Sequence, residues 1–197
     1  LNTIIIGLIW YQVIAHVGIS AGLHRYWAHS AFKANTCFEC VSLYLSILAG
    51  SRSPIGWIAA HRMHHSHSDT EHDPRSPRFK GFWIVFLSLW TLKNIPVKYS
   101  KDFFHKHWLI IWTTTAVVTL CISPWLFLGM VVIPGILAPI GFGTVNALCH
   151  INGESRNIPL ANLLVAGEGY HSEHHSGKVL RFHKYDLTGF VLEKIYG

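Results

Sequence analysis

Histidines are concentrated in three short polar clusters of this 197-residue chain, which carries 15 histidines in all. The clusters read HRYWAH at residues 24–29, HRMHH at 61–65 and HSEHH at 171–175. In an HxxHH pattern on a helix, offsets of three and four residues place side chains on one face, where several imidazoles can approach a common centre. Clustered histidine of this kind indicates metal binding.

Asn146 and His150 form a fourth candidate group, again on one helix face because four residues separate them. Nine histidines and an asparagine are too many ligands for one ion and suit two. Imidazole ligation is compatible with iron, zinc or copper, so the ligand type alone leaves the metal open. His24 and His29 are five residues apart, about 140° around an ideal helix, so this pair requires either a distorted helix end or two different metals.

Acidic residues flank the clusters and could accept a hydrogen bond from the outer ring nitrogen of a ligand, which would fix the orientation of the imidazole. Solvated surface charge is the alternative interpretation. The candidates are Asp69, Glu71, Asp73, Glu168 and Glu173. The remaining histidines lack a matching cluster, and we interpret them as interfacial or solvated; they are His16, His67, His72, His105, His107 and His183.

The composition indicates a membrane protein, because half of the residues are hydrophobic and only 13% are charged, against roughly one quarter in soluble proteins. The net charge is +6, but the basic residues form no stripe, which argues against nucleic-acid binding. The four cysteines lie in or beside apolar stretches and indicate no disulfide framework. Cys37 and Cys40 form a lone CxxC without the two further ligands that a zinc site needs.

Three stretches are long enough to span a membrane as helices: residues 1–23, 108 to about 127, and about 128 to 148. The last two, separated only by the Ser123-Pro124 and Gly129 region, form a predicted tight hairpin. Residues 37–60 are apolar but interrupted by charged residues, glycine and proline, so we predict a re-entrant or protein-buried segment that returns to its starting side. Residues 81–92 are too short to span, and Trp83 and Trp90 suit the headgroup region.

The positions of the basic residues test this topology. All 16 lysines and arginines fall within residues 24–107 or 150–197, outside the predicted first span and hairpin. If residues 37–60 do not cross, every basic residue lies on one face, as the positive-inside rule requires of a cytoplasmic side. All histidine clusters then emerge on that side and can meet. The sequence therefore predicts an all-α integral-membrane helical bundle with a cytoplasmic histidine-rich helical cap.

The motifs resemble those of the membrane fatty acid desaturase family, which combines HX4H, HX2HH and HX2HH with an asparagine and a histidine before the last box. The strings HRYWAH, HRMHHSHSDTEHDP and GEGYHSEHH look like those of the acyl-CoA desaturase branch. The resemblance runs over nearly the whole chain and implies two irons that activate dioxygen, with Asn146 at the position that holds a metal-bound water. The implied metal-site residues are His24, His29, His61, His64, His65, Asn146, His150, His171, His174 and His175.

The family typically has four spanning helices in two hairpins, and the first of these is missing from the pattern here. We therefore expect residues 1–197 to form a single desaturase domain truncated at its N-terminus. The metal ligands are the only catalytic residues that we predict.

The resemblance implies oxygen-dependent introduction of a cis double bond into a fatty acyl chain, carried by coenzyme A or a lipid. Removing hydrogen from an unactivated methylene requires a strong oxidant, and two irons can share the electrons that cleave dioxygen. No cytochrome, ferredoxin or flavin motif is present, so we expect an external electron-donor protein such as cytochrome b5 or a ferredoxin. The expected location is the lipid bilayer of a bacterial inner membrane or the endoplasmic reticulum.

Two alternatives remain open. A di-iron membrane hydroxylase, or another oxygenase of the same histidine-box type, would use the same oxidant and yield an alcohol instead of an alkene. A non-enzymatic metal transporter would place ionisable residues in the middle of its spans. The second and third predicted spans contain none beyond Cys121, which argues against transport.

Overall fold

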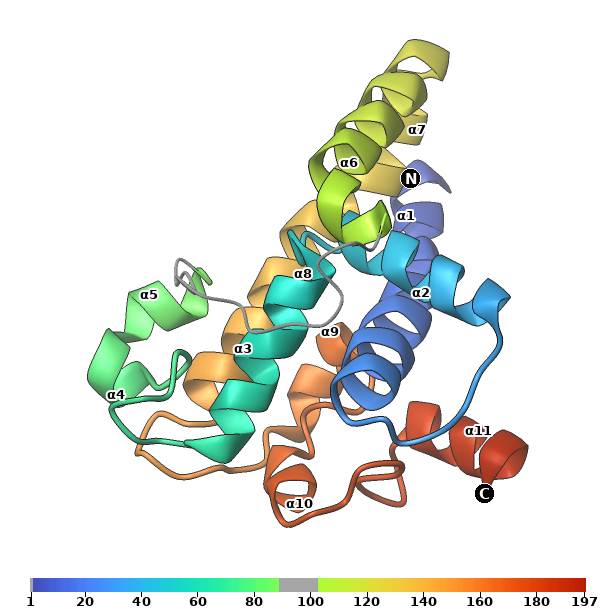
Figure 1. Ribbon diagram of the computed structural model, residues 1–197. Helices are drawn as coiled ribbons and strands as arrows, with labels where there is room; N and C mark the ends of the chain where they lie inside the picture. Colours follow the sequence, from blue (N-terminus) through green and yellow to red (C-terminus); the bar gives the residue numbers. More distant parts are fainter. Residues whose placement is uncertain (1, 89–102) are drawn as a thin grey trace.

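A computed structural model describes residues 2–88 and 103–197, and all of the regular secondary structure in these two ranges is helical. The first helix runs without a break from α1 (Asn2–Val13) into η1 (Ile14–Ala28), a π-helix. The molecule is elongated, with the N-terminus, α6 and α7 at one end and the C-terminal segment at the other (Figure 1). The predicted all-helical class is confirmed.

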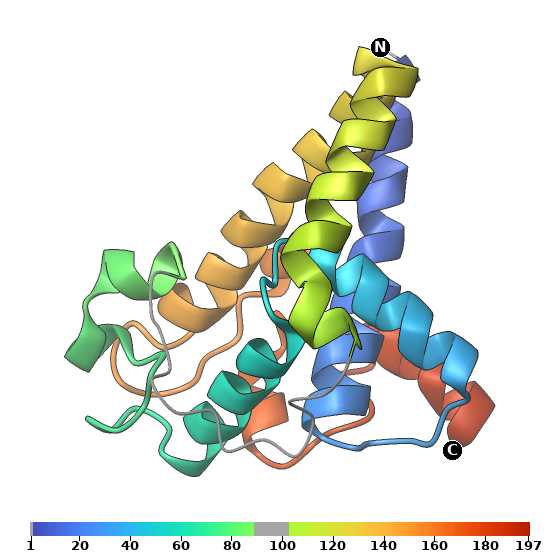
Figure 2. The same cartoon turned by 45° about the horizontal axis from the view of Figure 1, so that its top comes forward.

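Three long helices form the bundle at the N-terminal end (Figure 2). They are α1, α6 (Phe103–Ile122), and a composite helix made of α7 (Pro124–Phe127), η2 (Leu128–Val132), α8 (Ile133–Gly143) and η3 (Thr144–Leu148). Small residues bring two of them close together: a Cβ on Gly7 would lie 3.0 Å from Gly129 Cα. By length and composition, the helices over Asn2–Ala28 and Pro124–Leu148 could cross a membrane.

The hairpin turn lies at Ser123–Pro124, within the region predicted to separate the two spans. The span boundary that we expected near residues 127 and 128 comes earlier, because α6 ends at Ile122 and the next helix begins at Pro124. Ser123 has an extended backbone (φ −166°, ψ 133°), and its Oγ accepts a hydrogen bond from the Trp125 amide at 3.2 Å. Proline at the first helical position has no amide to leave unsatisfied, so this pair makes a strong helix start.

Residues 37–60 fall in two helices, α2 (Thr36–Leu48) and α3 (Pro54–Ser66). They form an inverted V whose apex points toward α6 (Figures 1 and 2). Gly50 (φ 75°) lies in the turn at the apex, a conformation that glycine adopts without steric cost. The helices pack against η1, so the segment is largely buried by protein; whether it enters the membrane stays a prediction.

Short helices complete the other end of the molecule. They are α4 (Pro77–Lys80), α5 (Phe82–Phe86), η4 (Pro159–Ala161), α9 (Asn162–Val165), α10 (His171–His175) and α11 (Leu187–Tyr196). Trp83 is 67% exposed, as an interfacial position requires, while Trp90 lies outside the described residues. The main hydrophobic core joins η1, α2, α3 and α8 around Leu23, Leu48, Trp57 and Phe142, directly beside the histidines.

Candidate metal centre

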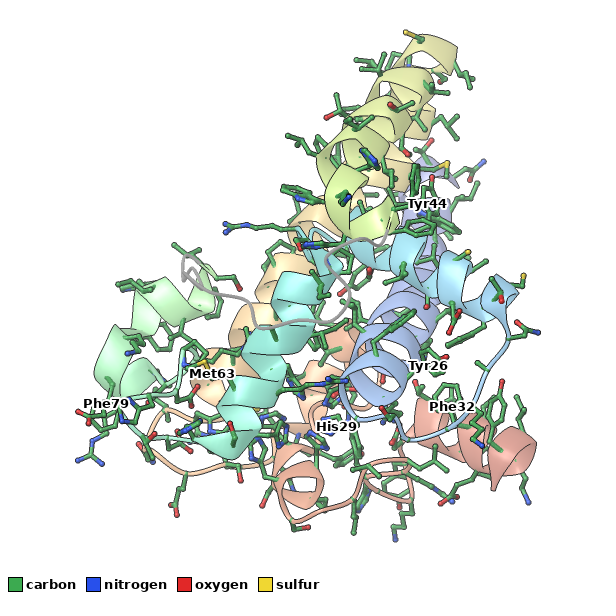
Figure 3. All side chains as sticks on the ribbon, viewed as in Figure 1. Tyr26, His29, Phe32, Tyr44, Met63 and Phe79 are labelled. Atoms are coloured by element: carbon green, nitrogen blue, oxygen red, sulfur yellow. The ribbon has the colours of Figure 1, made fainter. Side chains whose placement is uncertain are left out.

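The nine predicted histidine ligands meet at the end of the bundle opposite the N-terminus, where His29 lies between α3 and the end of η1 (Figure 3). They form two groups, and within each group the candidate ligand nitrogens all lie within 4.8 Å of one another. The five-histidine group consists of His24, His29, His61, His65 and His174. The four-histidine group consists of His64, His150, His171 and His175.

The π-helix η1 brings His24 and His29 into the same group. The His29 amide donates to the His24 carbonyl at 3.1 Å, a bond that spans five residues. In a π-helix five residues make roughly one turn, so the two side chains lie on one face, and their Nε2 atoms are 3.1 Å apart. Of the two alternatives drawn from the sequence, the structure has the distorted helix end.

Each HxxHH cluster contributes to both groups. On α3, His61 and His65 are four residues apart and enter the five-histidine group, whereas the intervening His64 enters the other. On α10 the same offset takes His171 and His175 into the four-histidine group, and His174 crosses to the other. Side chains four apart lie one above the other, whereas adjacent side chains such as His64 and His65 are about 100° apart around the helix. One short helix therefore serves two centres.

Carboxylates hold the outer nitrogens of three of these rings. His64 Nδ1 donates to Asp73 at 2.8 Å, His150 Nδ1 donates to Asp69 at 2.9 Å, and His24 Nδ1 contacts Glu168. These are three of the five predicted carboxylates. Glu71 is instead exposed beside His72, and no hydrogen bond joins Glu173 to a candidate ligand among the residues that the structure describes.

The outward hydrogen bonds determine which ring nitrogen carries the proton, and the result suits a bound metal ion. An Nδ1–H that donates outward leaves an unprotonated Nε2 whose lone pair points into the group. His24 contacts Glu168, and His174 Nδ1 donates to the Lys178 carbonyl at 3.0 Å, yet the two Nε2 atoms face each other at 3.0 Å. Two lone pairs repel at this separation unless a cation lies between them, so the histidines fit a metal site.

Burial keeps the imidazoles neutral, which is the form that binds metal. Removal from water disfavours the charged ring and lowers the pKa of His29 to about 4, of His65 to about 3 and of His175 to about 2. It lowers the pKa of His61 and His171 well below the usual value, and neighbouring histidines reinforce the effect.

Asn146 lies beside the groups and lines a small cavity that also reaches His24, His61 and His64. Its Oδ1 is 3.5 Å from Arg75 Nη1, at the limit of a hydrogen bond. The polar part of the wall also includes Arg75, Glu168 and His171, and the apolar part is formed by Ile19, Trp57, Phe142, Val145 and Val165. The cavity volume of about 20 Å³ is enough for about one water molecule beside the histidines.

Two buried arginines, Arg25 and Arg75, were not predicted as part of the site. Arg25 is completely buried and donates to Glu168 at 2.8 Å and to Asp186 at 2.7 Å. It thereby joins η1 to the segment before α10 and to the residue that caps α11. One sequence feature could have indicated that Arg25 is buried. This charged residue lies inside the first histidine cluster, directly after His24 at the end of an apolar helix.

The six histidines that we interpreted as interfacial or solvated all lie outside both groups. His16 Nδ1 is 2.7 Å from Thr188 Oγ1, and His183 stacks on Tyr170 with 4.3 Å between ring centres. His67 is exposed and lies beside Ser66.

The fold and the site together define a helical protein with two candidate membrane spans and a histidine metal site. Comparison with known proteins identifies the class more closely, although no family model matches the chain. The chain is 28% identical to sn-1 stearoyl-lipid 9-desaturase of Anabaena variabilis, over 95% of this chain and 78% of that protein. It is 28% identical to Delta-9 acyl-lipid desaturase 2 of Arabidopsis thaliana, over 84% of this chain and 61% of that protein.

A probable acyl-CoA desaturase of Schizosaccharomyces pombe is 29% identical over 95% of this chain, which covers 46% of that protein. The chain thus spans between about half and about three quarters of the length of these relatives. The matches support a fatty acid desaturase family for this chain, as the histidine motifs predicted. The relatives are oxidoreductases by name, and the enzyme class predicted for this chain agrees with them.

Proposed function

We propose that this chain introduces a cis double bond into a fatty acyl chain in an oxygen-dependent reaction at a centre of two irons. The observation that carries the proposal is the convergence of nine histidines in two groups, with an outward-held Nδ1 and an inward-facing Nε2 at His24, His64, His150 and His174. When bound, two irons would supply the strong oxidant that removal of hydrogen from an unactivated methylene requires. Iron is favoured over zinc because desaturation, the reaction named for the relatives, is oxidative.

The proposed histidine ligands are divided between the two irons according to the two groups in the structure. The five-histidine group would hold one iron and the four-histidine group the other. Asn146 would bind a water at the site, as in the family pattern. Asp69, Asp73 and Glu168 fix the ring orientations from outside, and such outer partners raise the basicity of a ligand.

The cavity wall supports a fatty acyl substrate. Trp57, Phe142 and Val145 would line the path of a hydrocarbon segment beside the histidines, and the cavity of about 20 Å³ would have to widen to admit it. The position of the acyl chain along this wall would decide which pair of carbons reacts. Acyl-lipid and acyl-CoA desaturases both occur among the relatives, so either carrier is consistent with the proposal.

We further propose that residues 1–197 form one desaturase domain embedded in a bilayer, with the metal centre on the cytoplasmic side. The confinement of every lysine and arginine to residues 24–107 and 150–197 supports this orientation. An external donor such as cytochrome b5 or a ferredoxin would supply the electrons.

Expression in a host that lacks the activity tests the proposed function. The chain is produced together with cytochrome b5 or a ferredoxin, and total acyl chains are identified by mass spectrometry. New cis-unsaturated chains that are absent from a matched His64→Ala strain are expected. A hydroxylated product would instead identify the alternative oxygenase, and an unchanged acyl profile with both donors would contradict the proposal.

A further inference from the structure

Arg75 lies buried against the outer side of the five-histidine group and is only 1% exposed. Its Nη1 is 3.1 Å from His61 Nδ1, and its Nη2 donates to the Trp57 carbonyl at 3.1 Å. The guanidinium also stacks over the Trp57 ring, 4.6 Å from its centre. A guanidinium has donors only, so His61 Nδ1 accepts from a cation, whereas His64 and His150 donate to a carboxylate at the same atom. The proton of neutral His61 then lies on Nε2, which faces His29 Nε2 at 2.8 Å, and a metal ion bound there would have to displace it.

The two groups therefore differ in the charge that surrounds them. In the four-histidine group, Asp73 and Asp69 each accept from a ligand ring. In the five-histidine group, the carboxylate at His24 is Glu168, which is also paired with Arg25 at 2.8 Å. Burial lowers the pKa of Arg75 to about 9, which still leaves the guanidinium charged at neutral pH.

We propose that Arg75 makes the two metal positions unequal, so that the five-histidine group binds a divalent cation more weakly than the four-histidine group. This inference rests on the proposed two-metal centre. A buried positive charge repels a nearby cation strongly because little water screens it. Among the residues that the structure describes, no carboxylate accepts from His61, so this ring has no anionic partner of the kind that strengthens a ligand. Arg75 is thus a positioning residue that acts on the metal through His61.

Binding of Co²⁺ to the metal-free full chain in detergent tests this assignment, with the visible absorption of bound Co²⁺ as the readout. Two binding steps are expected. The His65→Ala variant should further weaken the weaker step, and the His175→Ala variant should weaken the tighter one. Arg75→Gln should tighten the weaker step roughly tenfold or more, because a unit charge is removed from a poorly screened site. Arg75→Lys keeps the charge and should restore the wild-type ratio.

A second variant changes the ratio of the two Co²⁺ affinities through the four-histidine group. Asp69→Asn removes the carboxylate from His150 and should weaken the tighter step, which also reduces the ratio of the two affinities. Asp69→Asn decides the question if Arg75→Gln fails to elute as a folded species. A ratio indifferent to these substitutions, or equal weakening of both steps in Arg75→Gln, overturns the role of Arg75. Failure of Co²⁺ to bind either group would overturn the two-metal centre itself.

Discussion

His24 and His29 face each other with their Nε2 atoms 3.1 Å apart, although five residues separate them in the chain. The i to i+5 hydrogen bonding of η1 produces this relationship, since an α-helix would turn the two rings about 140° apart. The carbonyl of His24 accepts the amide of His29 at 3.1 Å and closes the last wide turn. The local winding of the backbone therefore decides that the first box serves one metal position.

Metal analysis of the purified protein should find two irons per chain. The expectation follows from the two groups, each with enough imidazoles to hold one ion. Inductively coupled plasma mass spectrometry on protein of known concentration gives the stoichiometry. One zinc per chain and no iron would contradict the assignment.

Replacement of any one box histidine on α3 or α10 by alanine should abolish desaturation, because the ligands act as a unit and their losses are not additive. His64→Ala is the representative variant, since His64 is 2% exposed within the four-histidine group. The measurement is the unsaturated fraction of acyl chains at matched protein level.

His67→Ala is the matched control for the ligand series. His67 lies three residues beyond His64, is exposed and belongs to neither group. Its variant should keep most of the activity. Full activity in His64→Ala, or complete loss in His67→Ala at normal protein level, would show that the boundary of the site is drawn wrongly.

Asp73→Asn should reduce metal affinity or activity by roughly 10- to 100-fold, the usual effect of losing an outer partner of a metal ligand. Asp73 is completely buried and accepts from His64 Nδ1 at 2.8 Å and from the Arg75 amide at 2.8 Å. Although burial opposes ionisation, these hydrogen bonds lower the pKa of Asp73. Glu71→Gln, two residues away and exposed, should have little effect. Equal effects of the two substitutions on bound iron would refute a specific role for Asp73.

Residue 125 should lie on the opposite side of the membrane from every histidine cluster. Trp125 is 67% exposed at the hairpin turn, and the proposed orientation, which follows from the distribution of basic residues, has the clusters on the cytoplasmic side. Trp125→Cys and His67→Cys are made in a chain without its four native cysteines and labelled with a membrane-impermeant reagent in intact cells. Only Trp125→Cys should react; labelling of both from the same side would refute the topology.

Gly18→Ala should destabilise the protein by about 1–3 kcal/mol, the usual cost of overpacking a tight contact. A Cβ at Gly18 would lie 2.7 Å from Leu45 Cβ and 3.0 Å from the Leu45 carbonyl carbon. Gly135→Ala is the control, because its Cβ would meet nothing within 4 Å. Thermal unfolding in detergent compares the two variants. A transition temperature as high in Gly18→Ala as in Gly135→Ala would contradict the close packing of η1 on α2.

The histidine groups were predictable from the sequence to the extent that local spacing defines a helix face. Offsets of three and four residues predicted that each HxxHH cluster forms a compact set of imidazoles. The long apolar stretches predicted the helices of the bundle, because roughly twenty apolar residues form a spanning helix. The Ser123–Pro124 break between the hairpin helices was also predictable, because proline favours the first position of a helix. The span boundary expected near residue 127 was about four residues late, since hydropathy is nearly constant there.

The tertiary structure alone decided how these faces meet. Nothing in the sequence around α3 indicates that His61 and His65 join His24 while His64 joins His150, because that division depends on the packing of α3 against η1 and on where the fold brings His150. The burial of Arg25 depends likewise on Glu168 and Asp186, which lie 143 and 161 residues further along the chain. The spacing of residues in the sequence determines which side chains share a helix face. Whether a charged side chain can be buried depends on distant residues, because the charge is stable there only when they complete its hydrogen bonds.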